Sequence, residues 1–106
     1  MSLPSLSEEE RAEALRKAVA ARAARSDIKA KLKSGKATVA SVIEAASSSP
    51  AIGRLKVTDL LEALPGIGKV RATVIMSELG IAPTRRVRGL GVHQRRALVE
   101  YVERTA

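Results

Sequence analysis

The chain has 106 residues and a net charge of +8, from 19 basic and 11 acidic side chains. This length fits one domain, and the charge favours a polyanionic partner such as nucleic acid. The absence of cysteine excludes disulfides and thiolate metal ligands, and no apolar run approaches the roughly 20 residues of a membrane span, so we expect a soluble intracellular protein with no membrane partner.

Residues 7–33 predict one long helix. Ser7 and Glu10 have the spacing of a capping box, and three consecutive glutamates suit the first turn of a helix. No glycine or proline follows until Gly35. The apolar stripe is thin and rich in alanine, so we expect the helix to project from the body of the protein. It is too thin for a strong coiled coil.

The long helix also carries a basic face, whose members follow one another at steps of three or four residues. They are Arg22, Arg25, Lys29, Lys33 and Lys36. This spacing places them on one side of the helix if the helix extends that far. Two interpretations stay open, an ordinary solvated surface or a surface that lies along a phosphate backbone. A helix of this length measures about 40 Å, comparable with a turn of duplex.

Four further helices are predicted between cap and breaker residues. One follows a cap at Thr38 and ends in the run 47–50, a short turn over 51–55 leads to a helix at 58–64, and the others span 68–79 and 92–104. Gly80 and Ile81 predict a Schellman end for the helix 68–79, and residues 82–91 form a loop with room for one helical turn. We therefore predict an all-α fold, with a projecting helix over 1–36 and a compact helical head over 37–106.

The segment 64–72 reads Leu-Pro-Gly-Ile-Gly-Lys-Val-Arg-Ala and predicts a helix-hairpin-helix. Its glycines allow backbone angles that a Cβ would oppose, and its unpaired amides at the helix start would be directed at a phosphate. Ile67 is expected to anchor the hairpin in the core. The alternative is a plain turn between packed helices, but the basic setting favours nucleic-acid contact. The candidate contacts are Gly66, Gly68, Lys69, Val70 and Arg71.

Residues 84–91 form a second basic candidate site, with the sequence Thr-Arg-Arg-Val-Arg-Gly-Leu-Gly. We expect Val87 and Leu90 to pack into the core, which would direct the arginines outward. Arginine suits bidentate phosphate contact and insertion into a narrow minor groove. The alternative is a solvated loop. The candidate contacts are Arg85, Arg86, Arg88 and Gly89.

The hairpin, the helix after it, the arginine-rich loop and the last helix together resemble the helix–two-turns–helix unit of one small-subunit ribosomal protein and of the formamidopyrimidine glycosylase family. With the long basic helix in front, the whole chain resembles the actinobacterial integration host factor family. This resemblance implies a nucleoid-associated protein of the cytoplasm that binds double-stranded DNA, bends or compacts it with little sequence specificity, and supports phage integration with an integrase complex as partner. It also implies a backbone-binding hairpin and an arginine clamp. We expect a monomer in the absence of DNA.

Other functions were weighed against DNA binding. A structured-RNA binder stays open, because it too depends on phosphate contacts. Tyr101 is the only aromatic residue, which disfavours a single-strand binder with stacking platforms. A glycosylase or nuclease would need a pocket with a catalytic acid or nucleophile, and the five acids of residues 50–106 suit helix surfaces or packing. His93 has no second imidazole or cysteine with which to share a metal. We therefore predict no enzyme, no cofactor and no metal site.

Overall fold

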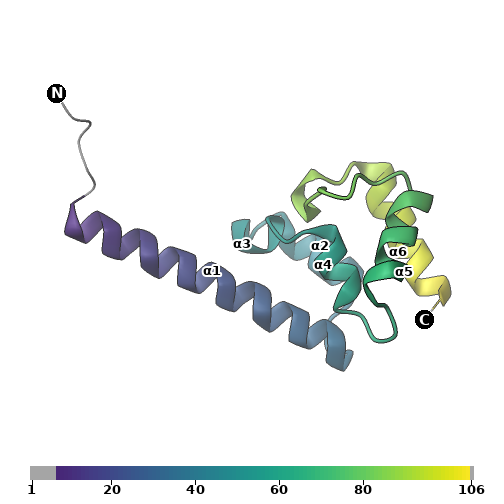
Figure 1. Cartoon of the computed structure of the whole chain (residues 1–106), viewed down its shortest axis with the longest axis horizontal. Coiled ribbons are helices and arrows are strands. Elements are labelled where there is room, and N and C mark those ends of the chain that lie inside the picture. Colours follow the sequence, from purple (N-terminus) through teal and green to yellow (C-terminus); the bar gives the residue numbers. More distant parts are fainter. Residues whose placement is uncertain (1–6, 106) are drawn as a thin grey trace.

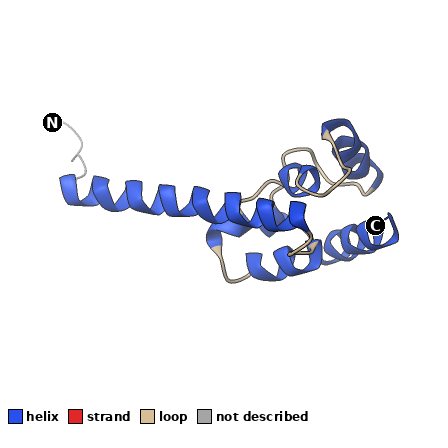
Figure 2. Ribbon diagram, turned by 90° about the horizontal axis from the view of Figure 1, so that it is seen from below, coloured by secondary structure: helices blue, strands red, loops and turns tan. Residues whose placement is uncertain are grey.

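The structure is a computed structural model and describes residues 7–105. A long helix leads into a head of short helices, within extents of 56 × 29 × 25 Å (Figure 1). The elements are α1 Glu8–Ser34, α2 Val39–Ala46, α3 Pro50–Gly53, α4 Val57–Glu62, α5 Lys69–Glu78, the 3-10 helix η1 Val87–Gly89 and α6 Val92–Thr105. The described residues contain no strand, which confirms the all-α prediction (Figure 2).

Helix α1 begins and ends where the sequence predicts, because both ends are capped. The Ser7 hydroxyl accepts a hydrogen bond from the Glu10 amide at 3.1 Å and donates one to the Glu10 carboxylate at 3.2 Å. At the other end Gly35 adopts φ +80°, the left-handed conformation that stops a helix. Lys36 therefore lies beyond the helix, so the condition for placing it on the basic face, a helix that extends that far, is not met.

The two halves of α1 differ in burial. Leu32 is 1% exposed, and Ile28 and Ala24 pack partly against the core of the head. Leu15 and Val19 are 63% and 54% exposed, and this half of the helix extends away from the head in Figure 1. The helix projects as expected, but its C-terminal half is part of the core. The division of the chain at residue 36 stays a prediction.

The core of the head is aliphatic, as a composition without phenylalanine or tryptophan requires. Leu60, Ile75 and Leu98 come from α4, α5 and α6, and each is fully buried. No polar or charged side chain of the described residues is buried with them. The apolar stripes of several short helices are thus joined into one cluster, which dispersion and hydrophobic burial stabilise.

The segment 47–57 is more helical than the sequence indicated. We expected a turn over 51–55, whereas α3 forms its first part. The Ser49 hydroxyl caps α3 by accepting from the Ile52 amide at 3.4 Å, and Pro50 occupies the first helical position, where its missing N–H costs nothing. Helix α4 begins at Val57 and ends at Glu62, two residues before the predicted end.

Helix α5 ends in the predicted Schellman motif. Gly80 adopts φ +67°, and the Ile81 amide donates to the Met76 carbonyl at 2.8 Å. Ile81 is 3% exposed, so the turn is also tied to the core. The chain then runs back across the head as the loop that contains η1, the one helical turn expected between residues 82 and 91.

The burial of the core leads to a first prediction. Leu98→Ala should lower the free energy of unfolding by about 2–5 kcal/mol, because it leaves a cavity in a fully buried site. Leu15→Ala makes the same chemical change on the exposed part of α1, and should change that free energy by less than about 0.5 kcal/mol. Urea denaturation followed by circular dichroism measures both, and equal losses would contradict the division of α1 into a packed and a projecting half.

Candidate nucleic-acid interface

Two connections of the head are joined side by side by backbone hydrogen bonds. The Val57 amide donates to the Arg85 carbonyl at 3.0 Å, and the Val87 amide donates to the Leu55 carbonyl at 2.9 Å. Between these bonds Lys56 forms an isolated antiparallel bridge with the loop. The segment between α3 and α4 and the arginine loop, residues 84–91, therefore form one unit.

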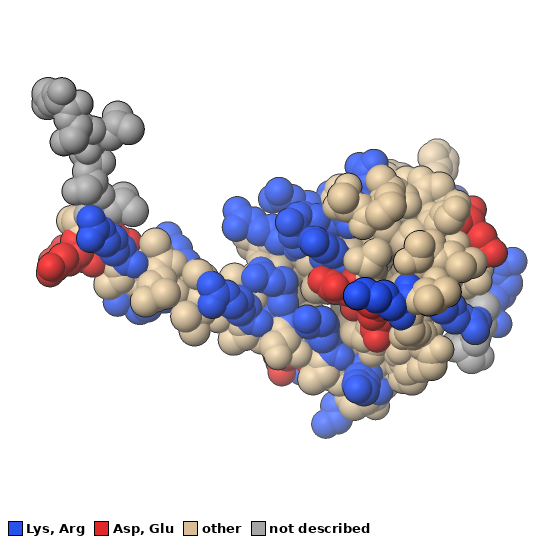
Figure 3. Space-filling model, viewed as in Figure 1, with Lys and Arg blue, Asp and Glu red and all other residues tan. Residues whose placement is uncertain are grey.

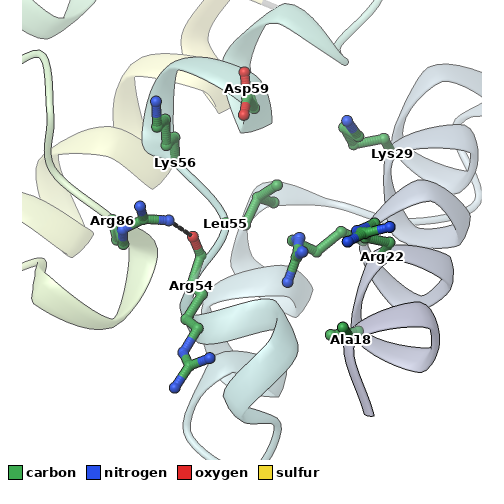
Figure 4. Close-up of a pocket in the computed structure, with 10 residues that line it drawn as sticks. Ala18, Arg22, Lys29, Arg54, Leu55, Lys56, Asp59 and Arg86 are labelled. Atoms are coloured by element: carbon green, nitrogen blue, oxygen red, sulfur yellow. Dashed lines mark hydrogen bonds between the residues drawn. The ribbon is translucent and has the colours of Figure 1, made fainter. Parts of the chain in front are cut away.

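The arginine loop is anchored as the sequence predicts. Val87 and Leu90 are 2% and 5% exposed, and the side chains of Arg86 and Arg88 are at the surface. The Arg86 guanidinium donates to the Arg54 carbonyl across the paired segments (Figure 4). The loop is therefore not a freely solvated connection.

A hollow of about 340 Å³ lies between α1 and the head, and we call it the basic groove. Basic side chains reach it from α1, from the α3–α4 connection and from the arginine loop (Figure 4). The six basic lining residues are Arg22, Arg25, Lys29, Arg54, Lys56 and Arg86. The remaining lining residues are Ala18, Ala21 and Leu55, which are apolar, and Asp59.

The charges of the basic groove are not neutralised within the protein. Six cations and one carboxylate leave a local net charge of 6 − 1 = +5. In residues 7–105 the salt bridges join Arg16 to Glu13 and Lys31 to Asp27, all on α1 and all outside the lining of the groove. Figure 3 shows Lys and Arg side chains over α1 and over the adjoining side of the head. An anion in the groove would reduce the electrostatic repulsion between these cations.

The residues of the basic face of α1 line two neighbouring hollows. Arg22, Arg25 and Lys29 line the basic groove, and the half-buried Arg25 also donates to the Ala51 carbonyl at 3.5 Å. Lys33 lies one turn beyond Lys29, in a neighbouring hollow that Asp59 and Glu62 also line. The acidic side chains there make the end of the face less positive than its middle.

The predicted hairpin is present at residues 64–72. Gly66 adopts φ +79°, a conformation that a Cβ would oppose, and the half-buried Ile67 packs against the core as expected. Helix α5 then begins after Gly68 without a side-chain cap, so its first amides are unpaired. Lys69, Val70 and Arg71 are exposed. No residue of the hairpin lines the basic groove.

The three arginines of the loop do not converge on one point. Arg86 lines the basic groove, whereas the half-buried Arg85 donates to the Gly89 carbonyl at 3.1 Å. Arg88 lies against α3, since a Cβ added to Gly53 would stand 3.2 Å from the Arg88 Cβ. The loop thus offers separate positive positions rather than a single cluster.

Arg54 and Lys56 were not among the predicted site residues. They lie in residues 37–64, a segment with two basic and three acidic residues, whose net charge does not indicate a basic site. The signal was the alternation Arg-Leu-Lys-Val over residues 54–57, in which Leu55 and Val57 are buried and the two basic residues are exposed. Such alternation indicates an extended segment with one buried side.

The fold and the groove define a small helical protein with a helix–two-turns–helix head and a basic interface. Residues 32–102 match the family described as S13-like H2TH domain. An integration host factor of Mycobacterium tuberculosis is 55% identical over 100 residues, which cover 94% of this chain and 95% of that protein. One from Streptomyces coelicolor is 52% identical over 94 residues, which cover 89% and 88% of the two chains.

A solved structure of sIHF bound to an 8-bp palindromic DNA superposes with a TM-score of 0.79 at 48% identity, and the match covers 81% of this chain and 97% of that one. The chain belongs to the integration host factor family. This membership confirms the resemblance drawn from the hairpin, the arginine loop and the long helix. It also supports the prediction that the protein is not an enzyme.

The contact between Gly53 and Arg88 leads to a second prediction. In Gly53→Ala the new Cβ would stand 3.2 Å from the Arg88 Cβ and 3.3 Å from the Ala46 carbonyl oxygen, and should cost about 1–3 kcal/mol of unfolding free energy. Gly68→Ala is the matched control, because nothing lies within 4 Å of its Cβ and its φ is −94°. Thermal unfolding compares the two, and a Gly53→Ala variant that is no less stable than Gly68→Ala would contradict the packing of Arg88 on α3.

Proposed function

We propose that this protein binds double-stranded DNA through the phosphate backbone with low sequence specificity, and bends or compacts it. The observation that carries the proposal is the basic groove, where α1 and the head present six cations that have no ion-pair partner among residues 7–105. Membership of the integration host factor family supports it, and a relative of known structure is described as bound to DNA.

In the proposed complex, the groove receives phosphates of one strand. Arg22 and Lys29 approach from α1, and Arg86 approaches from the opposite wall, held by its bond to the Arg54 carbonyl. Guanidinium groups form bidentate, charge-assisted hydrogen bonds with phosphate oxygens. Contacts of this kind fix position on the duplex without reading the bases, which accounts for low sequence specificity.

The hairpin is proposed as a second attachment point. Its glycines, Gly66 and Gly68, allow a phosphate to approach the unpaired amides at the start of α5, beside Lys69. The hairpin and the arginine loop lie at opposite ends of α5, a helix of ten residues and about 15 Å. Because one buried core joins the two points, a duplex that contacts both follows the surface of the head, and this favours bending.

The surrounding basic residues complete the proposed interface. Arg85, Arg88, Lys33 and Arg71 lie outside the groove and are proposed as peripheral phosphate contacts. Structured RNA is the alternative ligand, and the relative whose solved structure is bound to DNA favours DNA over it. Support of phage integration with an integrase complex, a nucleoid location in the cytoplasm and a monomeric state without DNA stay predictions.

A fluorescence anisotropy titration across a salt series tests the proposal. A labelled DNA duplex of three helical turns and the RNA duplex of the same sequence serve as ligands. Six phosphate contacts in the groove give an expected log–log salt slope of about −5 on DNA. DNA bound more tightly than RNA supports the proposal. RNA binding that is equal or tighter favours structured RNA as the ligand. If neither duplex binds, the proposed function is rejected.

The groove residues that the sequence analysis missed supply a sharper test. Arg54→Gln/Lys56→Gln should lower DNA affinity at least about tenfold and reduce the salt slope by about 2, since two phosphate contacts are lost. Arg95→Gln/Arg96→Gln removes the same charge from exposed positions of α6 that line another hollow. Equal effects of the two variants would show that net charge, not the basic groove, determines the affinity.

A further inference from the structure

The cations of the basic groove line one small hollow. They come from three elements around a hollow of about 340 Å³ (Figure 4), a size in the range of small-molecule sites. One strand of a duplex carries one charge per about 3.4 Å of helix axis, so the charge of DNA is spread along a line. A charge of +5 around one hollow is better matched by an anion whose charges are close together.

Part of the groove is already held in position for binding. The Arg86 guanidinium donates to the Arg54 carbonyl, and Arg25 donates to the Ala51 carbonyl at 3.5 Å. Groups fixed before binding lose little side-chain entropy when the ligand arrives. The side chains of Arg22, Lys29 and Lys56 are exposed and make no hydrogen bond or ion pair among residues 7–105. These three side chains are free to move onto an anion that the fixed arginines hold.

The apolar and acidic members of the lining limit what fits. Ala18 and Ala21 leave space beside the arginines of α1, and Leu55 forms the wall on the side of the head. Asp59 is the one carboxylate of the groove and is half-buried. The Asp59 carboxylate repels a phosphate at its own position. It can accept hydrogen bonds from the hydroxyl or amino groups of a nucleoside that carries the phosphates.

We propose that the basic groove is a binding site for a compact polyphosphate of three or more linked phosphates, either inorganic or carried by a nucleoside. Such a ligand occupies the cations that we assign to DNA, so it displaces DNA from this part of the interface. The displacement rests on the proposed function, whereas the binding of the polyphosphate does not.

Isothermal titration calorimetry of the full chain tests the binding without DNA. Inorganic triphosphate, adenosine triphosphate and orthophosphate are titrated separately at one fixed ionic strength. The expected result is a single site at which triphosphate binds at least about tenfold more tightly than orthophosphate, because several charge-assisted hydrogen bonds form at once. Adenosine triphosphate binding more tightly than inorganic triphosphate identifies a nucleoside-linked ligand, and the reverse order identifies an inorganic one.

Three variants test whether the groove itself binds triphosphate or whether the overall positive charge of the protein attracts it. Arg22→Gln/Lys29→Gln removes two groove cations that are exposed and make no bond within the described chain, and should weaken triphosphate binding at least about tenfold. Arg95→Gln/Arg96→Gln is the charge-matched control outside the groove and should change it less than about twofold. Ala18→Leu keeps every charge but fills space in the groove, and should weaken triphosphate more than duplex DNA.

Several results would overturn the site. Orthophosphate that binds as tightly as triphosphate, more than one bound triphosphate per chain, or an equal loss in the two charge-matched variants each rejects it. Circular dichroism and the melting temperature of each variant show that it is folded. Displacement of a labelled duplex by triphosphate then tests the competition. If the protein binds triphosphate but no duplex, only the DNA proposal is rejected. If it binds duplex but no triphosphate, only the polyphosphate site is rejected.

Discussion

The paired backbone segments 55–57 and 85–87 hold together the parts on which the interface depends. The Val57 amide binds the Arg85 carbonyl and the Val87 amide binds the Leu55 carbonyl, while the side chains of Leu55, Val57 and Val87 are buried. Leu55 and Val57 are buried, whereas Arg54 and Lys56 are exposed. The same two hydrogen bonds place Arg86 beside them. A short piece of non-helical structure thus positions half the cations of a helical protein's groove.

The other half depends on how α1 is attached. Leu32 is buried in the head, and Ile28 and Ala24 pack beside it, so the C-terminal half of the helix is fixed while the N-terminal half extends away. Arg22 and Lys29 lie along the fixed part and face the head across the groove. The chain therefore places like charges opposite one another, at a cost in electrostatic repulsion that aliphatic packing must exceed. Such an arrangement is typical of a binding site whose ligand supplies the missing charge.

The groove and the hairpin contribute different kinds of contact to the proposed interface. The groove gathers full charges from separate elements, whereas the hairpin contributes backbone amides from one local turn, opened by Gly66 at φ +79°. Charges act over about 10 Å and weaken with salt, while amide contacts require close approach. The two also differ in the ligands that they admit. A concave site accepts a compact anion, and an exposed turn such as the hairpin suits an extended backbone.

Local patterns of the sequence determined the longer helices, the caps of α1 and α5 and the hairpin, because capping, glycine conformation and periodicity act over a few neighbouring residues. The short helix α3 was not predicted. The Ser7 cap, the Gly80 Schellman turn and the outward arginines of the loop were all predictable in this way. The grouping of the basic residues was not. In the sequence, Arg22 belongs to the basic face of the long helix, Arg86 belongs to the arginine loop, and Arg54 lies in a segment of low net charge. Only the tertiary structure decided that these three meet in one groove, because hydrogen bonds and buried side chains distant in sequence bring them together, and short-range propensity carries no information about such contacts.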